Sequence, residues 1–177
     1  GDQCTRPEHA ADQVVILRAY ARYLHQLGFG LSQAFIEQTL AAHPALTRAL
    51  VSLFRLLHDP DQSNDEVVAA NAKAIEDELD QVANLNEDRV LRQYLALIVA
   101  TLRTNWYLRD PSGGRRPALS FKIDPAKVPG MPEPKPMFEI FVYSPRFEGV
   151  HLRGGKVARG GLRWSDRPED FRTEVLG

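Results

Sequence analysis

Residues Met137–Tyr143 read MFEIFVY, a run dominated by aromatic and β-branched side chains. Such side chains pack well on a pleated, half-buried surface and are enriched in strands. A second extended stretch follows at Gly149–Arg153 and a third at Lys156–Arg163, with two glycines between them that permit a turn. This part of the chain is therefore predicted to form neighbouring β-strands.

The segment before these strands lacks the apolar spacing of a helix. Residues Asp110–Gly114 have the composition of a turn, and Pro117–Asp124 has the alternating character of a short strand. Residues Val128–Pro136 contain four prolines and a glycine, which forbid a helix because proline lacks the backbone donor. Residues 109–136 are therefore predicted to be a turn and a Pro-rich linker with a short strand.

The first half of the chain is predicted to be helical. Apolar residues recur at spacings of three and four along a first helix: Val14, Leu17, Ala21, Leu24 and Leu27. Gly28 is predicted to be the C-terminal cap of that helix, and Ser32 the N-cap of the next. A break at His43-Pro44, and a third helix that ends at His58–Pro60, follow from the restricted backbone around proline.

Two further helices are predicted before residue 108. One runs from about Ser63 to about Ala83, and the other has Asn86 as its N-cap. The second carries a wide apolar face, which predicts a helix packed against more than one neighbour. That face consists of Val90, Leu91, Tyr94, Leu95, Leu97, Ile98, Thr101, Leu102 and Trp106.

Together these elements predict an α+β fold. Residues 1–108 form an α-helical bundle, residues 109–136 the linker, and residues 137–177 the opening strands of an α/β unit. A last helix is predicted to begin at Pro168, with Ser165 or Asp166 as its cap, and the sequence stops within it at Gly177. We therefore expect this unit to be truncated and the chain to continue in a longer protein.

The composition narrows the class of protein. Hydrophobic residues make up 44% and charged residues 25% of the chain, and the net charge of −1 calls for neither a nucleic acid nor an anionic membrane. No apolar stretch reaches the ~18–20 residues that span a bilayer. The single cysteine, Cys4, can form neither an internal disulfide nor a multi-cysteine metal site. We expect a cytoplasmic protein with no membrane, nucleic-acid or metal partner.

Basic residues gather near the end of the chain, where Arg146–Arg167 contains six bases and two acids. Within it, Arg153 and Arg159 each precede a pair of glycines. Paired glycines let a backbone approach a ligand, and a guanidinium can bind a carboxylate or phosphate through two parallel hydrogen bonds. A hairpin with turn glycines and solvated bases explains the same pattern, and the residues alone leave both interpretations open. RNA binding is disfavoured because these repeats lie between β-branched and aromatic residues.

The same region resembles a known family of enzymes. Residues Arg159–Ser165, RGGLRWS, resemble the Lys-Gly-Gly-Leu/Ile-Arg-aromatic motif of glutamate dehydrogenases. Residues Glu139–Arg146, EIFVYSPR, and Glu148–Lys156, EGVHLRGGK, resemble the large NAD-specific subclass in particular, and Asp170–Gly177 continues that pattern. The resemblance is specific over Phe138–Gly177 and identifies residues 137–177 as the start of a glutamate dehydrogenase substrate-binding domain.

The resemblance implies roles for four residues. The lysine that opens the motif helps to bind a carboxylate of glutamate in this family, and Arg159 stands in its place, which keeps the charge but replaces a point donor with a planar fork. Gly160 and Gly161 would let the end of the strand approach the substrate. Arg163 is expected to form a structural ion pair first and to contact substrate second.

The resemblance also implies what lies elsewhere. The parent enzyme would convert L-glutamate, NAD and water to 2-oxoglutarate, ammonia and NADH, as a homo-oligomer. The family's catalytic lysine belongs to a Gly-Gly-x-Lys-Gly-Gly segment that this sequence lacks. Gly28-Phe29-Gly30 is no dinucleotide fingerprint, because Gln33 stands where the third glycine should be. We therefore predict no catalytic or NAD-binding residue on this chain and no activity of the chain alone.

A function of another class remains open at this point. The chain could be a non-catalytic helical binding or assembly module with a basic, anion-binding hairpin. If the chain is part of the enzyme, its helices are expected to connect regulatory regions to the catalytic core. The strands from Phe138 to Arg163 would normally pair with residues outside this chain, so we expect exposed edges there and either self-association or local disorder.

Overall fold

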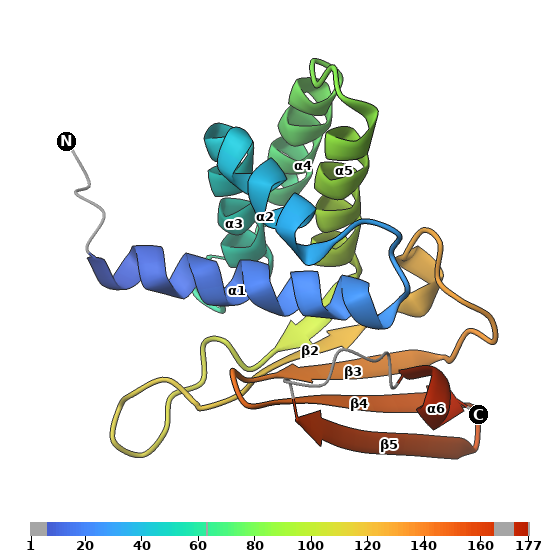
Figure 1. Cartoon of the computed structure of the whole chain (residues 1–177). Helices are drawn as coiled ribbons and strands as arrows, with labels where there is room; N and C mark the ends of the chain where they lie inside the picture. Colours follow the sequence, from blue (N-terminus) through green and yellow to red (C-terminus); the bar gives the residue numbers. More distant parts are fainter. Residues whose placement is uncertain (1–6, 63, 165–171, 177) are drawn as a thin grey trace.

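The computed structural model describes residues 7–62, 64–164 and 172–176, and shows three stacked levels (Figure 1). A five-stranded sheet lies at the base, the long first helix crosses one face of it, and four further helices stand on the other side of that helix. The helices are α1 (Pro7–Gln26), α2 (Gln33–Ala42), α3 (Pro44–His58), α4 (Asp65–Leu79), α5 (Leu85–Ala100) and α6 (Arg172–Leu176). The strands are β1 (Thr101–Thr104), β2 (Leu119–Ile123), β3 (Phe138–Tyr143), β4 (Phe147–Gly154) and β5 (Val157–Trp164).

The sheet is an antiparallel meander in the order β1-β2-β3-β4-β5. Its pairing register puts Ile123, Glu139, Leu152 and Arg159 in one row across four strands. Because side chains alternate between the two faces of a strand, this row shares its face with the row through Phe121 and Phe141. That face is the one on which α1 lies.

Four aromatic side chains, here called the aromatic cluster, join three helices to the sheet: Tyr20, Phe54, Tyr94 and Phe121. The ring of Tyr20 stacks on Phe121 with a centroid separation of 4.4 Å, and it meets Phe54 and Tyr94 edge-on at 6.2 and 6.1 Å. All four side chains are fully buried. Stacked and edge-on aromatic pairs are favourable geometries, so α1 is fixed between the upper helices and the sheet.

The predicted apolar stripe of α1 is partly wrong. Val14 is 44% exposed, whereas Ile16, Tyr20 and Tyr23 are fully buried. The remaining predicted positions, Ala21, Leu24 and Leu27, are buried, and Leu17 packs against the core. The difference arises because α1 is covered on two sides, so its buried surface is wider than a single stripe and includes two tyrosines.

The helix boundaries that depend on local signals are confirmed. The Ser32 hydroxyl accepts a hydrogen bond from the Phe35 amide at 3.0 Å, as an N-cap does, and α3 begins at Pro44. Gly28 adopts a φ of +72°, which suits the end of α1. Three local predictions for the first three helices therefore hold.

The boundaries of α4 and α5 differ from those predicted. Asn64 caps α4, which ends at Leu79, and the predicted start at Ser63 lies outside the described residues. Asn84, not Asn86, caps α5, because its side chain accepts from two amides of the first turn.

The end of α5 is also corrected. That helix stops at Ala100, and Thr101 pairs with Ile123 as the first residue of β1. Thr101 is buried, and its hydroxyl shares a hydrogen bond with Tyr20 Oη at 2.7 Å. The predicted helical region up to residue 108 therefore contains a strand, which is stabilised by pairing with a segment twenty residues away in the sequence.

The predicted strands are all present, and the α+β class is confirmed. Residues 119–123, 138–143, 147–154 and 157–164 are strands, and Gly155 adopts a φ of +62° in the turn before β5. Among the described residues the sheet is antiparallel throughout, so the parallel strands typical of an α/β unit do not occur there. The predicted cap at Ser165 or Asp166 lies outside the described residues, and α6 occupies residues 172–176. One hydrophobic core includes side chains from all three predicted segments, so the core does not mark boundaries between them. The predicted domain boundaries stay a prediction.

Candidate functional site

The strand β5 carries the four residues that the sequence singled out. Its register places Arg159 opposite Leu152, Gly160 opposite His151, Gly161 opposite Val150 and Arg163 opposite Glu148. Side chains alternate along a strand, so Arg159 and Gly161 belong to the face that bears α1 and α6, and Gly160 belongs to the opposite face. The structure therefore places the four residues side by side on one edge strand but divides them between two faces of the sheet.

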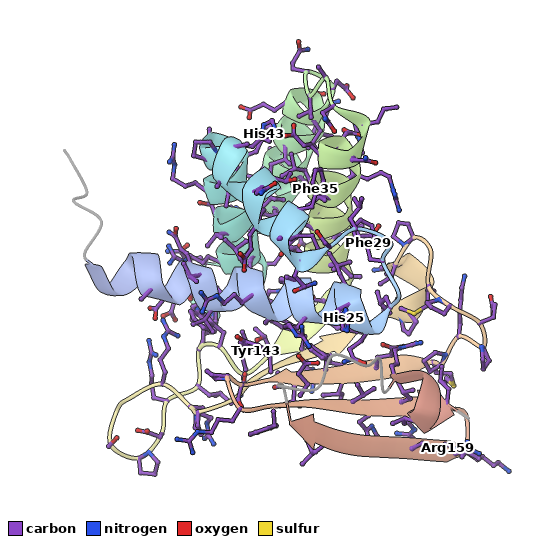
Figure 2. The ribbon with its side chains drawn as sticks, in the orientation of Figure 1. His25, Phe29, Phe35, His43, Tyr143 and Arg159 are labelled. Carbon is purple, nitrogen blue, oxygen red and sulfur yellow. The ribbon has the colours of Figure 1, made fainter. Side chains whose placement is uncertain are left out.

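Arg159 lies at the edge of a small cavity of about 160 Å³ between the linker, β4, β5 and α6. Figure 2 shows its side chain at the α6 end of β5. The guanidinium is exposed, and its Nη1 donates a hydrogen bond to the Leu176 carbonyl at 3.0 Å. The cavity walls include Pro134, Lys135, Leu152, Val157, Arg159 and Val175.

Two cations and several apolar side chains line this cavity. Lys135 is the second cation, and its Nζ lies 4.0 Å from Glu133 in an exposed pair that contributes little to stability. None of the described residues that line the cavity is acidic. A cavity of this charge suits a small anion, because two cations attract it while no lining carboxylate repels it.

Gly160 of the motif and Gly149 on the neighbouring strand both lie where β4 and β5 pack closely. A Cβ at Gly160 would lie 3.1 Å from the Val150 carbonyl oxygen and 3.3 Å from the His151 ring, so a side chain there would crowd the neighbouring strand. A Cβ at Gly149, on β4, would lie only 2.6 Å from the Leu162 side chain. Close packing of β4 on β5 is therefore one physical reason for glycine here, and an approach to substrate by Gly160 or Gly161 stays a prediction.

Arg163 faces Glu148 across the β4–β5 ladder by backbone register. Its side chain lies outside the described residues, so its predicted ion pair stays a prediction. Both carboxylate oxygens of Glu148 already accept hydrogen bonds, from Arg22 Nε and from Gln26 Nε2.

Sequence reasoning missed a set of polar side chains, buried except for the partly exposed Arg22 and here called the polar network. It consists of Arg22, Tyr23 and Gln26 on α1, Glu139 on β3, Glu148 on β4 and Arg172 on α6. Glu139 and Arg172 form an ion pair with exposed fractions of 0% and 1%. The sequence shows that Glu139 lies within the apolar run MFEIFVY. Both faces of that strand are otherwise apolar, so the sequence does not tell which face is covered or whether Glu139 is buried.

The hydroxyl of Tyr23 is a fixed donor in this network. It donates to Glu139 Oε2. Burial raises the pKa of Tyr23 well above its ordinary value, the neighbouring Glu139 carboxylate raises it further, and the Arg172 guanidinium opposes this in part. The phenol therefore stays protonated at neutral pH, and Glu139 accepts from it and from Arg172 at once.

Two of the described histidines, His43 and His58, contact side chains of neighbouring helices or of their own helix. The ring of His58 is tilted against Phe54 at 4.9 Å, and burial lowers its pKa to about 4. The Nε2 atom of His43 lies 3.0 Å from Glu87. Within residues 7–62, 64–164 and 172–176, no three His, Cys, Asp or Glu side chains are grouped as a metal ion requires.

The length and apolar character of the described helices bear on whether one could cross a membrane. Over the described part of the chain, no single helix has the length and apolar character needed to cross a membrane. The pair α2 and α3 meets these criteria only when taken together across a bend of 100°.

Two family comparisons match this chain. The family described as bacterial NAD-glutamate dehydrogenase, catalytic domain, matches residues 74–177, and the family described as glutamate dehydrogenase, helical motif 3, matches residues 8–60. The first match begins within α4 and includes α5 and the whole sheet. The second covers α1, α2 and α3.

Individual relatives agree with these matches. The NAD-specific glutamate dehydrogenases of Halomonas elongata, Pseudomonas aeruginosa and Mycobacterium tuberculosis are 58%, 53% and 52% identical over 166, 176 and 170 residues. Each alignment covers 93% of this chain, and the chain spans 10% of the length of each relative. With the catalytic-domain match covering more than half of its residues, the chain belongs to the bacterial NAD-glutamate dehydrogenase family.

Proposed function

We propose that this chain is part of an enzyme that converts L-glutamate, NAD and water to 2-oxoglutarate, ammonia and NADH. Three relatives that are more than half identical are named NAD-specific glutamate dehydrogenases, and each is about ten times as long as the chain. Here the complete enzyme means a protein of their length that contains this segment. We propose that it acts in the cytoplasm, where a lone cysteine stays reduced. We also propose that it is a homo-oligomer, and the exposed apolar side chains of Val157 and Leu162 on the edge strand β5 agree with such association.

Within that enzyme, Arg159 binds a carboxylate of glutamate. The observation that supports this role is the position of Arg159 beside a small cavity. The described residues that line the cavity include Lys135 as a second cation and no acid. A guanidinium presents two parallel donors to a carboxylate, and such charge-assisted bonds are stronger than neutral ones. The apolar walls at Leu152 and Val175 suit the methylene groups between the two carboxylates of the substrate.

The neighbouring motif residues have supporting roles. Gly160 and Gly161 keep the β5 backbone free of side chains next to Arg159. The main role of Arg163 is a structural ion pair, and contact with substrate is its secondary role. These assignments follow from the family motif, and the tight packing of Gly160 on β4 agrees with a glycine requirement at that position.

NAD and the catalytic lysine belong to other parts of the enzyme. Gly28-Phe29-Gly30 joins α1 to α2, whereas a dinucleotide fingerprint joins a strand to a helix. Gly28 ends α1 through its positive φ, and the Ser32 hydroxyl already accepts from the Phe35 amide at the start of α2. That loop therefore does not support an NAD site, and we expect no glutamate-dependent NADH formation by the 177-residue chain alone.

Equilibrium binding of 2-oxoglutarate to the complete enzyme, measured by calorimetry without NAD, tests the role of Arg159. Arg159→Ala is expected to weaken binding about ten- to hundredfold, because it removes charge-assisted hydrogen bonds. The matched control is Arg153→Ala, which removes an exposed arginine of the same hairpin that lies on the other face of the sheet. Equal affinities for wild type and Arg159→Ala would refute the proposed carboxylate contact.

A further inference from the structure

The helix α6 is held at its first residue by a buried ion pair. Arg172 Nη2 donates to Glu139 Oε1, and both side chains are almost fully buried. The same Nη2 atom also contacts a sulfur atom, Met131 Sδ, at 3.2 Å. Because a buried charge is costly without its partner, Arg172 has little freedom to leave this position.

One turn of α1 provides further attachment. The Gln26 Oε1 atom accepts from the Arg172 backbone amide at 3.1 Å, and its Nε2 donates to Glu148 at 2.8 Å. Three residues earlier on the same helix face, Tyr23 donates to the other oxygen of Glu139. The place of α6 is therefore set jointly by the sheet and by α1.

The other end of α6 forms a wall of the cavity beside Arg159. Val175 and Leu176 line that cavity, and the Leu176 carbonyl accepts from Arg159 Nη1 at 3.0 Å. The two ends of this helix are about 6 Å apart at a rise of ~1.5 Å per residue, so a displacement of Arg172 moves the cavity wall as well.

We propose that Glu139 and Arg172 are positioning residues for the substrate carboxylate site. They fix α6 between α1 and the sheet, and α6 in turn fixes the direction of Arg159 through the Leu176 carbonyl. The proposal rests on the proposed function of Arg159. It also makes α1, which lies in the segment matched as a helical motif, the structural link between the helical region and the substrate.

The first test compares two long-range ion pairs in the complete enzyme, Glu139–Arg172 and Arg115–Asp12. Glu139→Gln removes the charge that holds α6, and it is expected to raise both Kd for 2-oxoglutarate and KM for glutamate roughly tenfold, with kcat changed much less, because small displacements of a binding group are costly. Arg115→Gln breaks the ion pair with Asp12 at the opposite end of α1 and leaves α6 untouched. That control is expected to keep Kd within about twofold of wild type.

A second variant separates positioning from folding. Glu139→Gln removes one charge of this buried ion pair and keeps the other, whereas the double variant Glu139→Leu with Arg172→Met removes both charges of the pair. It is expected to fold with wild-type cooperativity and still to bind 2-oxoglutarate several-fold more weakly, by roughly the factor of Glu139→Gln. A double variant that folds and binds with wild-type affinity would overturn the positioning role.

A double-mutant cycle decides whether the pair acts through Arg159. If it does, Glu139→Gln adds no further weakening in a protein that already carries Arg159→Ala. Additive losses would show that Glu139 acts elsewhere and would overturn this inference while the carboxylate contact of Arg159 stands. Wild-type binding by Arg159→Ala alone would instead overturn the proposed function, and the positioning role with it.

Discussion

Two tyrosines on neighbouring turns of α1 lie in contrasting surroundings. Tyr20 belongs to the aromatic cluster, where it stacks on Phe121 and has a single side-chain hydrogen-bond partner among the described residues, Thr101. Tyr23, three residues later, belongs to the polar network and donates to the buried Glu139. Both side chains are fully buried. The comparison indicates that α1 is attached to the sheet by two kinds of contact, one apolar and non-directional, the other charged and tied to α6.

The aromatic cluster and the polar network should contribute differently to the stability of the fold. Burial of aromatic surface stabilises the fold in proportion to the area removed from water. A buried ion pair gains little net stability, because the cost of removing both charges from water offsets their attraction. The aromatic cluster should therefore supply stability, and the polar network should specify where α6 lies.

The largest expected effect is on the aromatic cluster. Phe121→Ala removes the ring that stacks on Tyr20 and is expected to lower the free energy of unfolding by about 4 kcal/mol, since it leaves a cavity between α1 and the sheet. Urea unfolding of the 177-residue chain measures this. A loss below about 1 kcal/mol would contradict the assignment of stability to this cluster.

The polar network should respond differently to single and double changes. Glu139→Gln is expected to lower the free energy of unfolding by about 3 kcal/mol, because it removes one charge of a buried ion pair and keeps the other. Glu139→Leu combined with Arg172→Met should restore most of that loss. Urea unfolding of both proteins checks this contrast, and a double variant as unstable as the single one would show that the pair itself stabilises the fold.

His58, which packs against Phe54 of the aromatic cluster, should make the free energy of unfolding depend on pH. Burial lowers the pKa of His58 from 6.5 to about 4, so the folded chain keeps this ring neutral while the unfolded chain protonates it. Stability that is present above pH 6.5 is therefore lost as the pH falls toward 4, by about 3 kcal/mol. Unfolding of wild type and His58→Gln between pH 4 and pH 7 measures the difference. Parallel curves for the two proteins would contradict burial of the neutral ring.

Exposed charges should matter least. Arg92 bridges Asp80 and Asp88 on the surface, with a nitrogen–oxygen distance of 2.9 Å to each. Arg92→Gln is expected to lower the free energy of unfolding by about 0.5 kcal/mol, and by less at high salt, because water and ions screen the pair. Thermal unfolding at two salt concentrations checks this, and a loss as large as that of Glu139→Gln would remove the distinction between buried and exposed charges.

The parts of the fold that were predicted from sequence depend on local chemistry. Ser32 caps a helix, and Pro44 starts one, through contacts within a few residues of each position. The end of α5 was missed because Thr101 is held by pairing with Ile123, which is distant in the sequence. Local propensity does not report such pairing.

The candidate site shows the same limit. The motif at Arg159 was visible as a sequence pattern, whereas the cavity beside it is assembled from the linker, two strands and α6. Lys135 was not singled out because an isolated lysine in a Pro-rich segment carries no signal of its own. The pairing of Glu139 with Arg172 joins residues that are far apart in the chain, so only the fold reveals it.

The steady-state kinetics of the complete enzyme test the central claim most directly. The KM for L-glutamate should rise about ten- to hundredfold in Arg159→Ala and recover in large part in Arg159→Lys, because a lysine restores the charge without the planar fork. The Arg153→Ala control should keep the wild-type KM. A wild-type KM in Arg159→Ala, or an equal rise in Arg153→Ala, would contradict the assignment of the substrate carboxylate to Arg159.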